Sequence, residues 1–438
     1  MPVILRGVFW SLVYAIAVIA PLVVAVLGEP PPSRGFLVDF SVALGFVGLA
    51  IMALQFALVA RFQHVAAPFG MDALLQFHRQ IGFVSLAFVL AHPALLVVAD
   101  PRTLRLFDIT SAPLRARFAV TSTVLLLGLV ATSVWRGRLR IRYETWQLIH
   151  GVLAVLVVAC ALAHIGLVGR YLARPWQRGL WLAFSATLVG LLGWVRVVKP
   201  LLRYRFPWRV ARVTPERGGA FTVELTPEGH EGIRFEAGQF AWLMIDTSPF
   251  ALMQHPFSIS SSSERPEELA FTIKARGDFT NTIASVPPGT RAWLDGPYGL
   301  FTIDRHEGPG FVFIGGGVGI TPLVSMLRTL ADREDPRPCT LFYGSKDWES
   351  VTFREELEAL AKRMRLSVVH VLEKPPEGWE GERGFVNAKV LERHLPPRRD
   401  RLQYFICGPS PMMDAMEEAL VRLRVPDERI QTERFEMV

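Results

Sequence analysis

Six long apolar runs, nearly free of ionised side chains, dominate the first 204 residues and limit what this chain can fold into. They lie at residues 8–27, 36–58, 81–99, 118–135, 145–163 and 179–195. Each approaches the length of about 20 residues that crosses a hydrocarbon core as a helix. Lipid offers backbone amides no hydrogen-bond partner, so helices are the natural structure for such runs. The pattern predicts a bundle of six transmembrane helices over residues 1–204.

The charges that flank these runs give little information on how the predicted helices are oriented in the membrane. The connecting loops on both sides are rich in arginine, so the charge difference between loops is weak. The first run follows Arg6 and could be a signal peptide, but it is long and lacks an A-x-A cleavage site, so we expect a retained helix. The net charge of +7 belongs to this half, which has only six acidic residues. Basic membrane loops explain that charge without nucleic-acid binding.

After Lys199 the composition becomes that of a soluble protein, with regular acidic residues and shorter apolar runs. Strand-like segments at 221–225, 240–245 and 269–273 alternate with Gly and Pro turns, which predicts an antiparallel β-barrel domain over residues 205–304. From residue 311 the order is strand, glycine loop, helix, strand. This order predicts a doubly wound α/β nucleotide-binding domain over residues 305–438.

Four histidines lie on predicted membrane helices, where ionisable side chains mark functional sites. His78 and His92 fall on the third helix, and His150 and His164 on the fifth. Both intervals are 14 residues, which puts the rings of each helix on nearly one face, about 21 Å apart. Two such helices run in the same direction, so His78 would meet His150 and His92 would meet His164. This duplicated spacing predicts two bis-histidine haems, whereas a lone histidine would more simply bond to another helix.

Two neighbouring features concern metal ligation. Arg79 follows His78 and could pair with a haem propionate or with a lipid headgroup. The chain has three cysteines, widely separated and without a CxxC motif, which excludes a disulfide framework and a cysteine-ligated iron–sulfur cluster. Any metal must therefore have other ligands.

Two tracts in the predicted barrel suit a flavin. The first is the motif HPFS, made of His255, Pro256, Phe257 and Ser258. It offers an aromatic wall and a hydroxyl donor to the flavin ring. The second is RGDFT, where the amide of Gly277 and the hydroxyl of Thr280 suit a pyrophosphate. Each tract alone could equally be an ordinary turn.

The last domain contains a glycine loop and a cysteine at the end of a strand. The loop and the start of its helix contain Gly315, Gly316, Gly317, Gly319, Thr321 and Pro322. Glycines let a phosphate approach backbone amides at a helix N-terminus. The run 402–406 leads into a second short motif, Cys407, Gly408 and Pro409. Taken alone Cys407 would be a core cysteine, but beside the glycine loop we expect it to line a nicotinamide.

Together these motifs resemble the ferric reductase and NADPH oxidase superfamily, in sequence order and over nearly the whole chain. That resemblance implies a six-helix haem domain fused to an FAD- and NAD(P)H-binding module. It implies two b-type haems held by the four histidines, a flavin lined by the HPFS motif and a nicotinamide nucleotide at the glycine loop and CGP motif. The residues implied to act in electron transfer are Ser258, Cys407 and the near-terminal aromatic Phe435, which three further residues follow.

The resemblance implies that NAD(P)H, flavin and two haems pass electrons across the membrane. No EF-hand pattern occurs, so we expect a compact bacterial-type member in the plasma membrane with its soluble module in the cytoplasm. The acceptor stays open between oxygen, giving superoxide, and a ferric chelate drawn to the basic side chains of Arg102, Arg105, Arg115 and Arg117. NADPH is slightly favoured over NADH by Lys346, although the adjoining Asp347 could oppose a 2′-phosphate.

Two other functions fit the same motifs. One is a membrane-anchored NAD(P)H:flavin reductase that passes electrons to a quinone or a partner haem protein. The other is a non-catalytic haem-binding membrane sensor. The sequence names neither an oligomeric state nor a protein partner.

Overall fold

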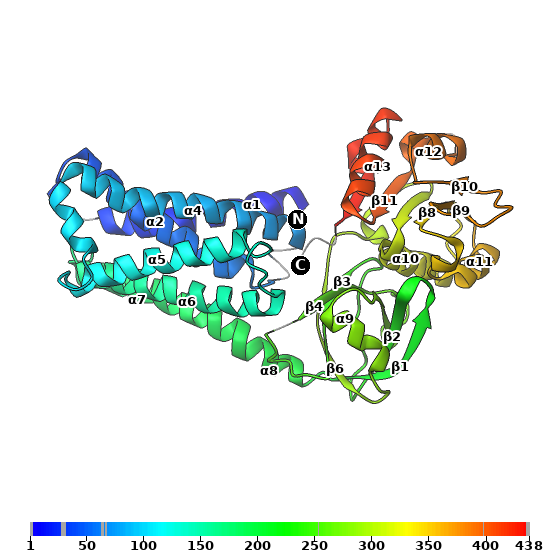
Figure 1. Ribbon diagram of the computed structural model, residues 1–438, viewed down its shortest axis with the longest axis horizontal. Coiled ribbons are helices and arrows are strands. Elements are labelled where there is room, and N and C mark those ends of the chain that lie inside the picture. The colour runs from blue at the N-terminus through cyan, green and yellow to red at the C-terminus, as the bar shows by residue number, and fades with distance from the viewer. Residues whose placement is uncertain are drawn as a thin grey trace. The chain divides into compact units, whose positions relative to one another are not determined.

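The computed structural model describes residues 3–27, 32–62, 65, 68–252, 254–396 and 398–434. The chain divides into two compact units, Met1–Lys199 and Pro200–Val438. We call the first the helical unit and the second the two-sheet unit, and Figure 1 labels the elements of each.

The helical unit is built from long apolar helices. They are α1 (Val3–Val26), α2 (Phe36–Leu58), α4 (Met71–Ala99), α5 (Leu114–Val134), α6 (Tyr143–Val168) and α7 (Pro175–Gly193). In the described part of the chain, six helices are long and apolar enough to cross a membrane. Large apolar side chains such as Ile16, Val98 and Leu182 are exposed along them, as lipid-facing residues are. The predicted six-helix bundle is confirmed.

Helices of this unit pack in two close pairs, α2 with α4 and α5 with α6. Ser85 Oγ donates to Gly48 O at 3.0 Å between the first pair, and Ser122 Oγ donates to Val157 O at 2.9 Å between the second. A Cβ on Gly48 would lie 3.2 Å from Val89, so glycine permits this approach. The described residues show no comparable backbone packing of α4 on α6, so only side chains can connect these two helices.

The first sheet of the two-sheet unit is antiparallel, in the order β4-β3-β6-β1-β2-β5. Its strands are β1 (Trp208–Glu216), β2 (Ala220–Pro227), β3 (Phe240–Ile245), β4 (His255–Ser258), β5 (Leu269–Lys274) and β6 (Arg291–Tyr298). The two outermost strands meet, because a bridge joins Ile259 to Phe271 and Ser260 N donates to Ala270 O at 2.7 Å. The sheet therefore curls into the predicted barrel around an apolar core.

The second sheet is parallel, in the order β10-β9-β8-β7-β11-β12. Its strands are β7 (Phe311–Gly316), β8 (Cys339–Ser345), β9 (Leu366–Leu372), β10 (Glu382–Arg383), β11 (Gln403–Cys407) and β12 (Ile430–Glu433). Helices α10 (Ile320–Asp332) and α11 (Arg354–Arg363) share an apolar core with one face, and α12 (Ala388–His394) and α13 (Ser410–Arg422) share one with the other. This is the doubly wound α/β fold expected from the sequence.

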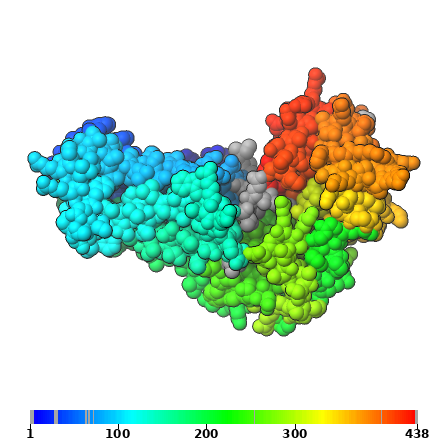
Figure 2. Space-filling view, viewed as in Figure 1, coloured from blue at the N-terminus to red at the C-terminus, as the bar shows by residue number. Residues whose placement is uncertain are grey.

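The barrel and the parallel sheet form adjoining lobes of the two-sheet unit, green and yellow to red in Figure 2. Arg328 connects them, since it pairs with Glu356 at 2.6 Å and donates to Ser260 O at 2.6 Å. The two compact units divide after residue 199, while the sixth membrane-length helical span continues to Tyr204, the residue at which the sequence ends the helical domain. The last part of that span is α8 (Lys199–Tyr204), whose Arg203 forms an ion pair with Asp295 of β6.

Candidate functional site

The four histidines of the helical unit meet in pairs drawn from α4 and α6. The ring centroids of His78 and His150 lie 6.3 Å apart, with the rings inclined by 58°. Two imidazoles that bind one metal ion at about 2 Å through nitrogen have centroids about 6 Å apart. His92 and His164 are close enough to interact electrostatically. The structure thus places His78 beside His150 and puts His164 within electrostatic range of His92, the pairing that the 14-residue spacing leads us to expect.

Hydrogen bonds assign the proton position on three of these rings. His92 Nδ1 lies 2.8 Å from Ser41 O, and His164 Nδ1 lies 2.8 Å from Arg115 O. A carbonyl oxygen only accepts, so each Nδ1 carries the proton. His150 Nδ1 lies 3.1 Å from Ser133 Oγ, whose own proton is donated to Leu129 O at 2.7 Å, so it too is protonated. Each ring is left with an Nε2 lone pair, the form in which histidine binds iron.

This donor set fits haem rather than a bare metal ion. Within the described residues, no group of three or more His, Cys, Asp or Glu side chains converges to hold an ion. Paired histidines supply the two axial ligands, while a porphyrin supplies the rest of the coordination. The pair of His78 and His150 and the pair of His92 and His164 therefore each suit one haem.

The flavin motif HPFS forms β4, at the edge of the barrel. His255 stacks on Phe279 with centroids 4.0 Å apart, and Phe257 lies 6.2 Å from the same ring. Ser258 is 5% exposed, and its hydroxyl has no hydrogen-bond partner among the described residues. A buried hydroxyl without a partner is costly, and a flavin edge would satisfy it. Pro256 pairs with Trp242 of β3, so it holds the strand in register.

The RGDFT tract lies at the start of α9 (Asp278–Thr282). Thr280 Oγ1 accepts hydrogen bonds from the amides of Arg276 at 2.9 Å and Gly277 at 2.8 Å. Its hydroxyl also lies 3.1 Å from Gly277 O. In this structure Thr280 closes the turn on itself, so the Gly277 amide that we expected to face a pyrophosphate is already paired.

The glycine loop packs directly on the CGP motif. A Cβ on Gly319 would lie 2.3 Å from Cys407 O, and one on Gly316 would lie 2.6 Å from Met412 Sδ and 3.0 Å from Pro409 Cδ. A Cβ on Gly408 would lie 3.1 Å from the Gly316 amide nitrogen. These glycines therefore allow two backbone segments to meet, a requirement additional to the approach of a phosphate.

Other residues fix the conformation of the glycine loop through strand register, backbone conformation and hydrogen bonds. Gly315 is in register with Cys407 on adjacent parallel strands, and Gly317 has a left-handed φ of +54°. Thr321 and Pro322 are buried at the start of α10, and the Thr321 hydroxyl donates to Val318 O at 2.7 Å. Burial raises the pKa of Tyr343 to about 12, so its phenol stays protonated and donates to Gly317 O at 3.2 Å.

The flavin and nucleotide motifs meet through two further residues. Ser258 is in register with Phe240 of β3, and a Cβ on Gly299 would lie 3.3 Å from Phe240 and 3.4 Å from Glu433 Oε1. Glu433 in turn is in register with Cys407, whose side chain is fully buried. Ser258 and Cys407, far apart in the sequence, thus belong to one neighbourhood. Phe435 lies outside the described residues.

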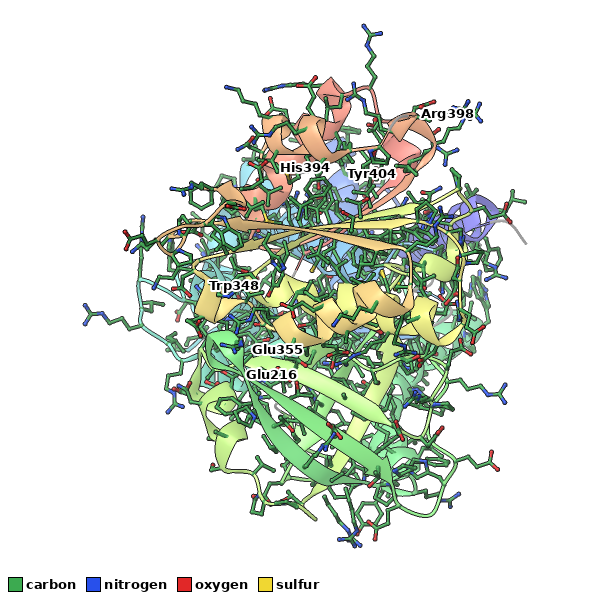
Figure 3. All side chains as sticks on the ribbon, turned by 90° about the vertical axis from the view of Figure 1, so that its right-hand side faces the viewer. Glu216, Trp348, Glu355, His394, Arg398 and Tyr404 are labelled. Atoms are coloured by element: carbon green, nitrogen blue, oxygen red, sulfur yellow. The ribbon has the colours of Figure 1, made fainter. Side chains whose placement is uncertain are left out.

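An ion cluster holds the loop after β8 against the barrel, at the junction marked by Glu216, Trp348 and Glu355 in Figure 3. Arg217 bonds Glu355 and Glu349, each at 2.7 Å. Its guanidinium lowers the pKa of Glu355 to about 2. A Cβ on Gly218 would lie 2.7 Å from Ser350 O, so the β1–β2 turn and this loop touch directly. The loop carries Lys346, so its position bears on nucleotide binding.

Sequence reasoning missed several residues of these sites. Ser41, Ser133 and Trp146 surround the histidines, but a serine or tryptophan in an apolar helix carries no distinctive spacing. Glu433 is 5% exposed at the end of β12. The sequence signal that could have identified Glu433 is its position two residues before the near-terminal aromatic Phe435.

Three family models match the chain in sequence order. One described as "Ferric reductase like transmembrane component" matches residues 44–161. An "FAD-binding domain" matches residues 221–301, and an "Oxidoreductase NAD-binding domain" matches residues 313–418.

Individual relatives match parts of the chain. NADH-cytochrome b5 reductase 1 of Debaryomyces hansenii is 34% identical over 156 residues, which are 34% of this chain and 55% of the relative. The reductase component of propane 2-monooxygenase from Rhodococcus jostii is 29% identical over 236 residues, 52% of this chain and 62% of the relative. For NADH-cytochrome b5 reductase 2 of Mycosarcoma maydis the matched part is 48% of the relative. The chain therefore spans between 48% and 62% of the length of these three proteins.

A solved structure of similar fold is the flavohem-like FAD/NAD-binding domain of nitric oxide dioxygenase from Vibrio cholerae. It matches 52% of this chain and 98% of its own, at 22% identity and a TM-score of 0.47.

Proposed function

We propose that this chain, which has the domain architecture of the ferric reductase and NADPH oxidase superfamily, moves electrons from NAD(P)H through FAD and two b-type haems to an acceptor across the membrane. It is a multi-pass membrane oxidoreductase with FAD- and NAD(P)H-binding domains. The observation that carries the haem route is the opposition of His78 and His150, with ring centroids 6.3 Å apart, on two apolar helices.

Each group along this route has protein residues suited to hold it. When bound, a flavin takes up the hydride of NAD(P)H and gives electrons singly to haem iron, the conversion that a nicotinamide cannot perform alone. The paired histidines present Nε2 to the iron because Nδ1 is protonated and bonded in three of the four rings. Ser258 offers a buried hydroxyl to the flavin edge, and the glycine loop brings backbone close to the nucleotide.

The direction of transfer follows from where the reductant is found. NAD(P)H is a cytoplasmic metabolite, so the two-sheet unit faces the cytoplasm and electrons leave on the other side. We place the protein in a bacterial plasma membrane, with the His78/His150 haem on the cytoplasmic side and the His92/His164 haem on the outer side.

The acceptor we propose is molecular oxygen or a ferric chelate. The Arg117 guanidinium donates to Ala112 O at 2.8 Å and Thr110 O at 2.9 Å, which holds it in place and leaves its positive charge. Arg102 and Arg105 are exposed in the same loop, between α4 and α5. They can raise the local concentration of an anionic chelate. Anaerobic turnover with ferric citrate, compared with the aerobic superoxide yield, distinguishes the two acceptors.

The loop after β8 supports the preference for NADPH. The Asp347 carboxylate accepts from the Ser350 amide at 2.8 Å and so caps the turn that follows it. That hydrogen bond orients one oxygen of the carboxylate toward the turn and leaves its negative charge, so the preference for NADPH rests on the positive charge of Lys346 beside it. A kcat/KM ratio that favours NADPH is the expected result, and a strong preference for NADH would contradict it.

A sealed-vesicle assay tests transmembrane transfer directly. In inside-out vesicles loaded with ferric citrate, external NADPH should reduce the enclosed iron, and the His164→Ala variant should not, although its flavin is still reduced. Reduction only of an external quinone would favour the second candidate, a membrane-anchored flavin reductase. That candidate is favoured by the similarity to an NADH-cytochrome b5 reductase, a protein named for the reduction of cytochrome b5 by NADH.

A further inference from the structure

The two histidine pairs differ in what accepts their Nδ1 protons. In the outer pair, the Nδ1 of each histidine lies 2.8 Å from a backbone carbonyl oxygen. The acceptor is Ser41 O for His92 and Arg115 O for His164. In the inner pair His150 reaches only a hydroxyl, Ser133 Oγ, at 3.1 Å. His78 Nδ1 is buried and has no hydrogen-bond partner among the described residues. The inner rings are therefore the more weakly hydrogen-bonded.

The Ser133 hydroxyl is shared. It gives its proton to Leu129 O at 2.7 Å and accepts from Trp146 Nε1 at 3.3 Å, as well as from His150. A hydroxyl has one proton and two lone pairs, so this one has no capacity left. Trp146 lies one helical turn before His150, with ring centroids 5.2 Å apart. The indole thus competes with the imidazole for the same oxygen.

We propose that Ser133 and Trp146 are positioning residues that set the reduction potential of the inner haem above that of the outer haem. The inference rests on the proposed function. An imidazole whose N–H donates strongly gives more electron density to its metal, which favours the ferric state. The carbonyl acceptors of His92 and His164 strengthen N–H donation and so increase the electron density that these rings give to iron. The shared Ser133 hydroxyl has only a weak effect of this kind on His150. Electrons are then held at the inner site until an acceptor draws them from the outer one.

Two substitutions should shift the inner potential in opposite directions. Trp146→Phe removes the competing donor, so Ser133 accepts more strongly from His150 and the potential falls. Ser133→Ala removes the acceptor, so the potential rises. We expect each change to alter the reduction equilibrium of that haem about tenfold, which is about 59 mV for a one-electron couple.

The measurement is a spectroelectrochemical titration of the full-length, haem-loaded protein in detergent, which should resolve two components. Only the higher-potential component should move, and Ser133→Thr, which keeps the hydroxyl, should restore the original value. Thr123→Ala is the matched control, because Thr123 lies on the same helix and donates to Ala119 O at 3.0 Å, away from Ser133. Ser41→Ala should leave the inner component unchanged, since it alters only the His92 side. A low-spin ferric spectrum verifies that both haems keep two axial ligands.

The outcomes separate this inference from the proposed function. If two haems bind and NADPH reduces them, but Trp146→Phe and Ser133→Ala shift the same component in the same direction or not at all, the inference is wrong and the proposed function stands. The inference is also wrong if the lower-potential component moves. If the purified protein binds no haem, both are wrong.

Discussion

His92 depends on two small neighbours, Ser41 and Gly45, for its orientation. Ser41 bonds His92 through both its carbonyl and its hydroxyl, at 2.8 and 2.9 Å. A Cβ on Gly45 would lie 3.3 Å from the Nδ1 of His92, so even a methyl group there would press on the ring. Such contacts orient metal ligands in many proteins. At this scale the sites are defined by serine and glycine as much as by histidine.

At the flavin motif, we expect Ser258→Ala to slow the reduction of flavin by NADPH about a hundredfold, as loss of one preorganised donor does. FAD content should stay unchanged, because the substitution removes only an oxygen. Stopped-flow bleaching of the flavin measures the rate. Ser262→Ala is the control, since its hydroxyl accepts from the Glu264 amide outside the motif. Reduction at the wild-type rate in Ser258→Ala would contradict the assignment.

At the glycine loop, two alanine substitutions should differ in severity. Gly319→Ala places a Cβ 2.3 Å from Cys407 O, which should destabilise the two-sheet unit by about 3 kcal/mol. Gly317→Ala has open space and only the strain of φ +54°, which costs about 1 kcal/mol. Thermal unfolding of this unit in the full-length protein makes the comparison. Equal destabilisation would show that the packing of the loop on the CGP motif is unimportant.

At the scale of elements, the β1–β2 turn and the loop after β8 are joined by the Arg217 cluster. The pKa of Glu355 falls from 4.5 to about 2, mainly through its hydrogen bond to Arg217. A depressed acid contributes stability that is fully present above about pH 4.5 and is lost as the pH falls toward 2. The pair is exposed, so its contribution is small and screened by salt.

We therefore expect the melting-temperature difference between wild type and Glu355→Gln to be constant from pH 8 to pH 5. It should shrink below about pH 4.5 and become smaller in high salt. Thermal scans over that pH range, with Glu358→Gln on the same helix as control, test this. A difference that grows on acidification would have the wrong sign for the Arg217 pair.

A second connection between elements is the Arg203–Asp295 ion pair, with side chains 12% and 5% exposed. It ties α8 to β6, aided by the stacking of Tyr204 on Trp293 with centroids 6.1 Å apart. Removing one partner of a buried pair strands a charge, so Arg203→Met should destabilise this unit by about 3 kcal/mol or more. Adding Asp295→Asn should recover part of the loss. A double-mutant cycle with no coupling would show that the pair does not hold α8.

At the scale of the whole molecule, two kinds of feature could be predicted from the sequence. They are the helices that a lipid environment requires and the residue pairs that the helical repeat brings to one face. The apolar runs predict helices because lipid leaves no alternative, and all six are present. The 14-residue interval predicts which histidines meet, because helical geometry carries a ring to the same face after four turns. Strands 240–245 and 269–273 are recovered because short apolar runs bounded by turn residues mark them, and both are buried along nearly their whole length.

The features that escaped prediction depend on contacts between distant residues. The ion pair of Arg203 with Asp295 joins residues some ninety positions apart in the chain. The Gly277 amide is taken by Thr280 because that hydroxyl folds back on its own turn. The acceptors of the histidine protons lie on neighbouring helices, and no local pattern identifies them.

The central claim of the proposed function is that two b-type haems take electrons from the flavin. The most direct test is an anaerobic visible spectrum of the detergent-purified protein, with haem and flavin quantified, before and after NADPH. We predict about two b-type haems per flavin, both reduced by NADPH, with loss of haem but not of flavin in His78→Ala and His92→Ala. A fully flavinated protein without a Soret band would contradict the account and leave a membrane-anchored flavin reductase.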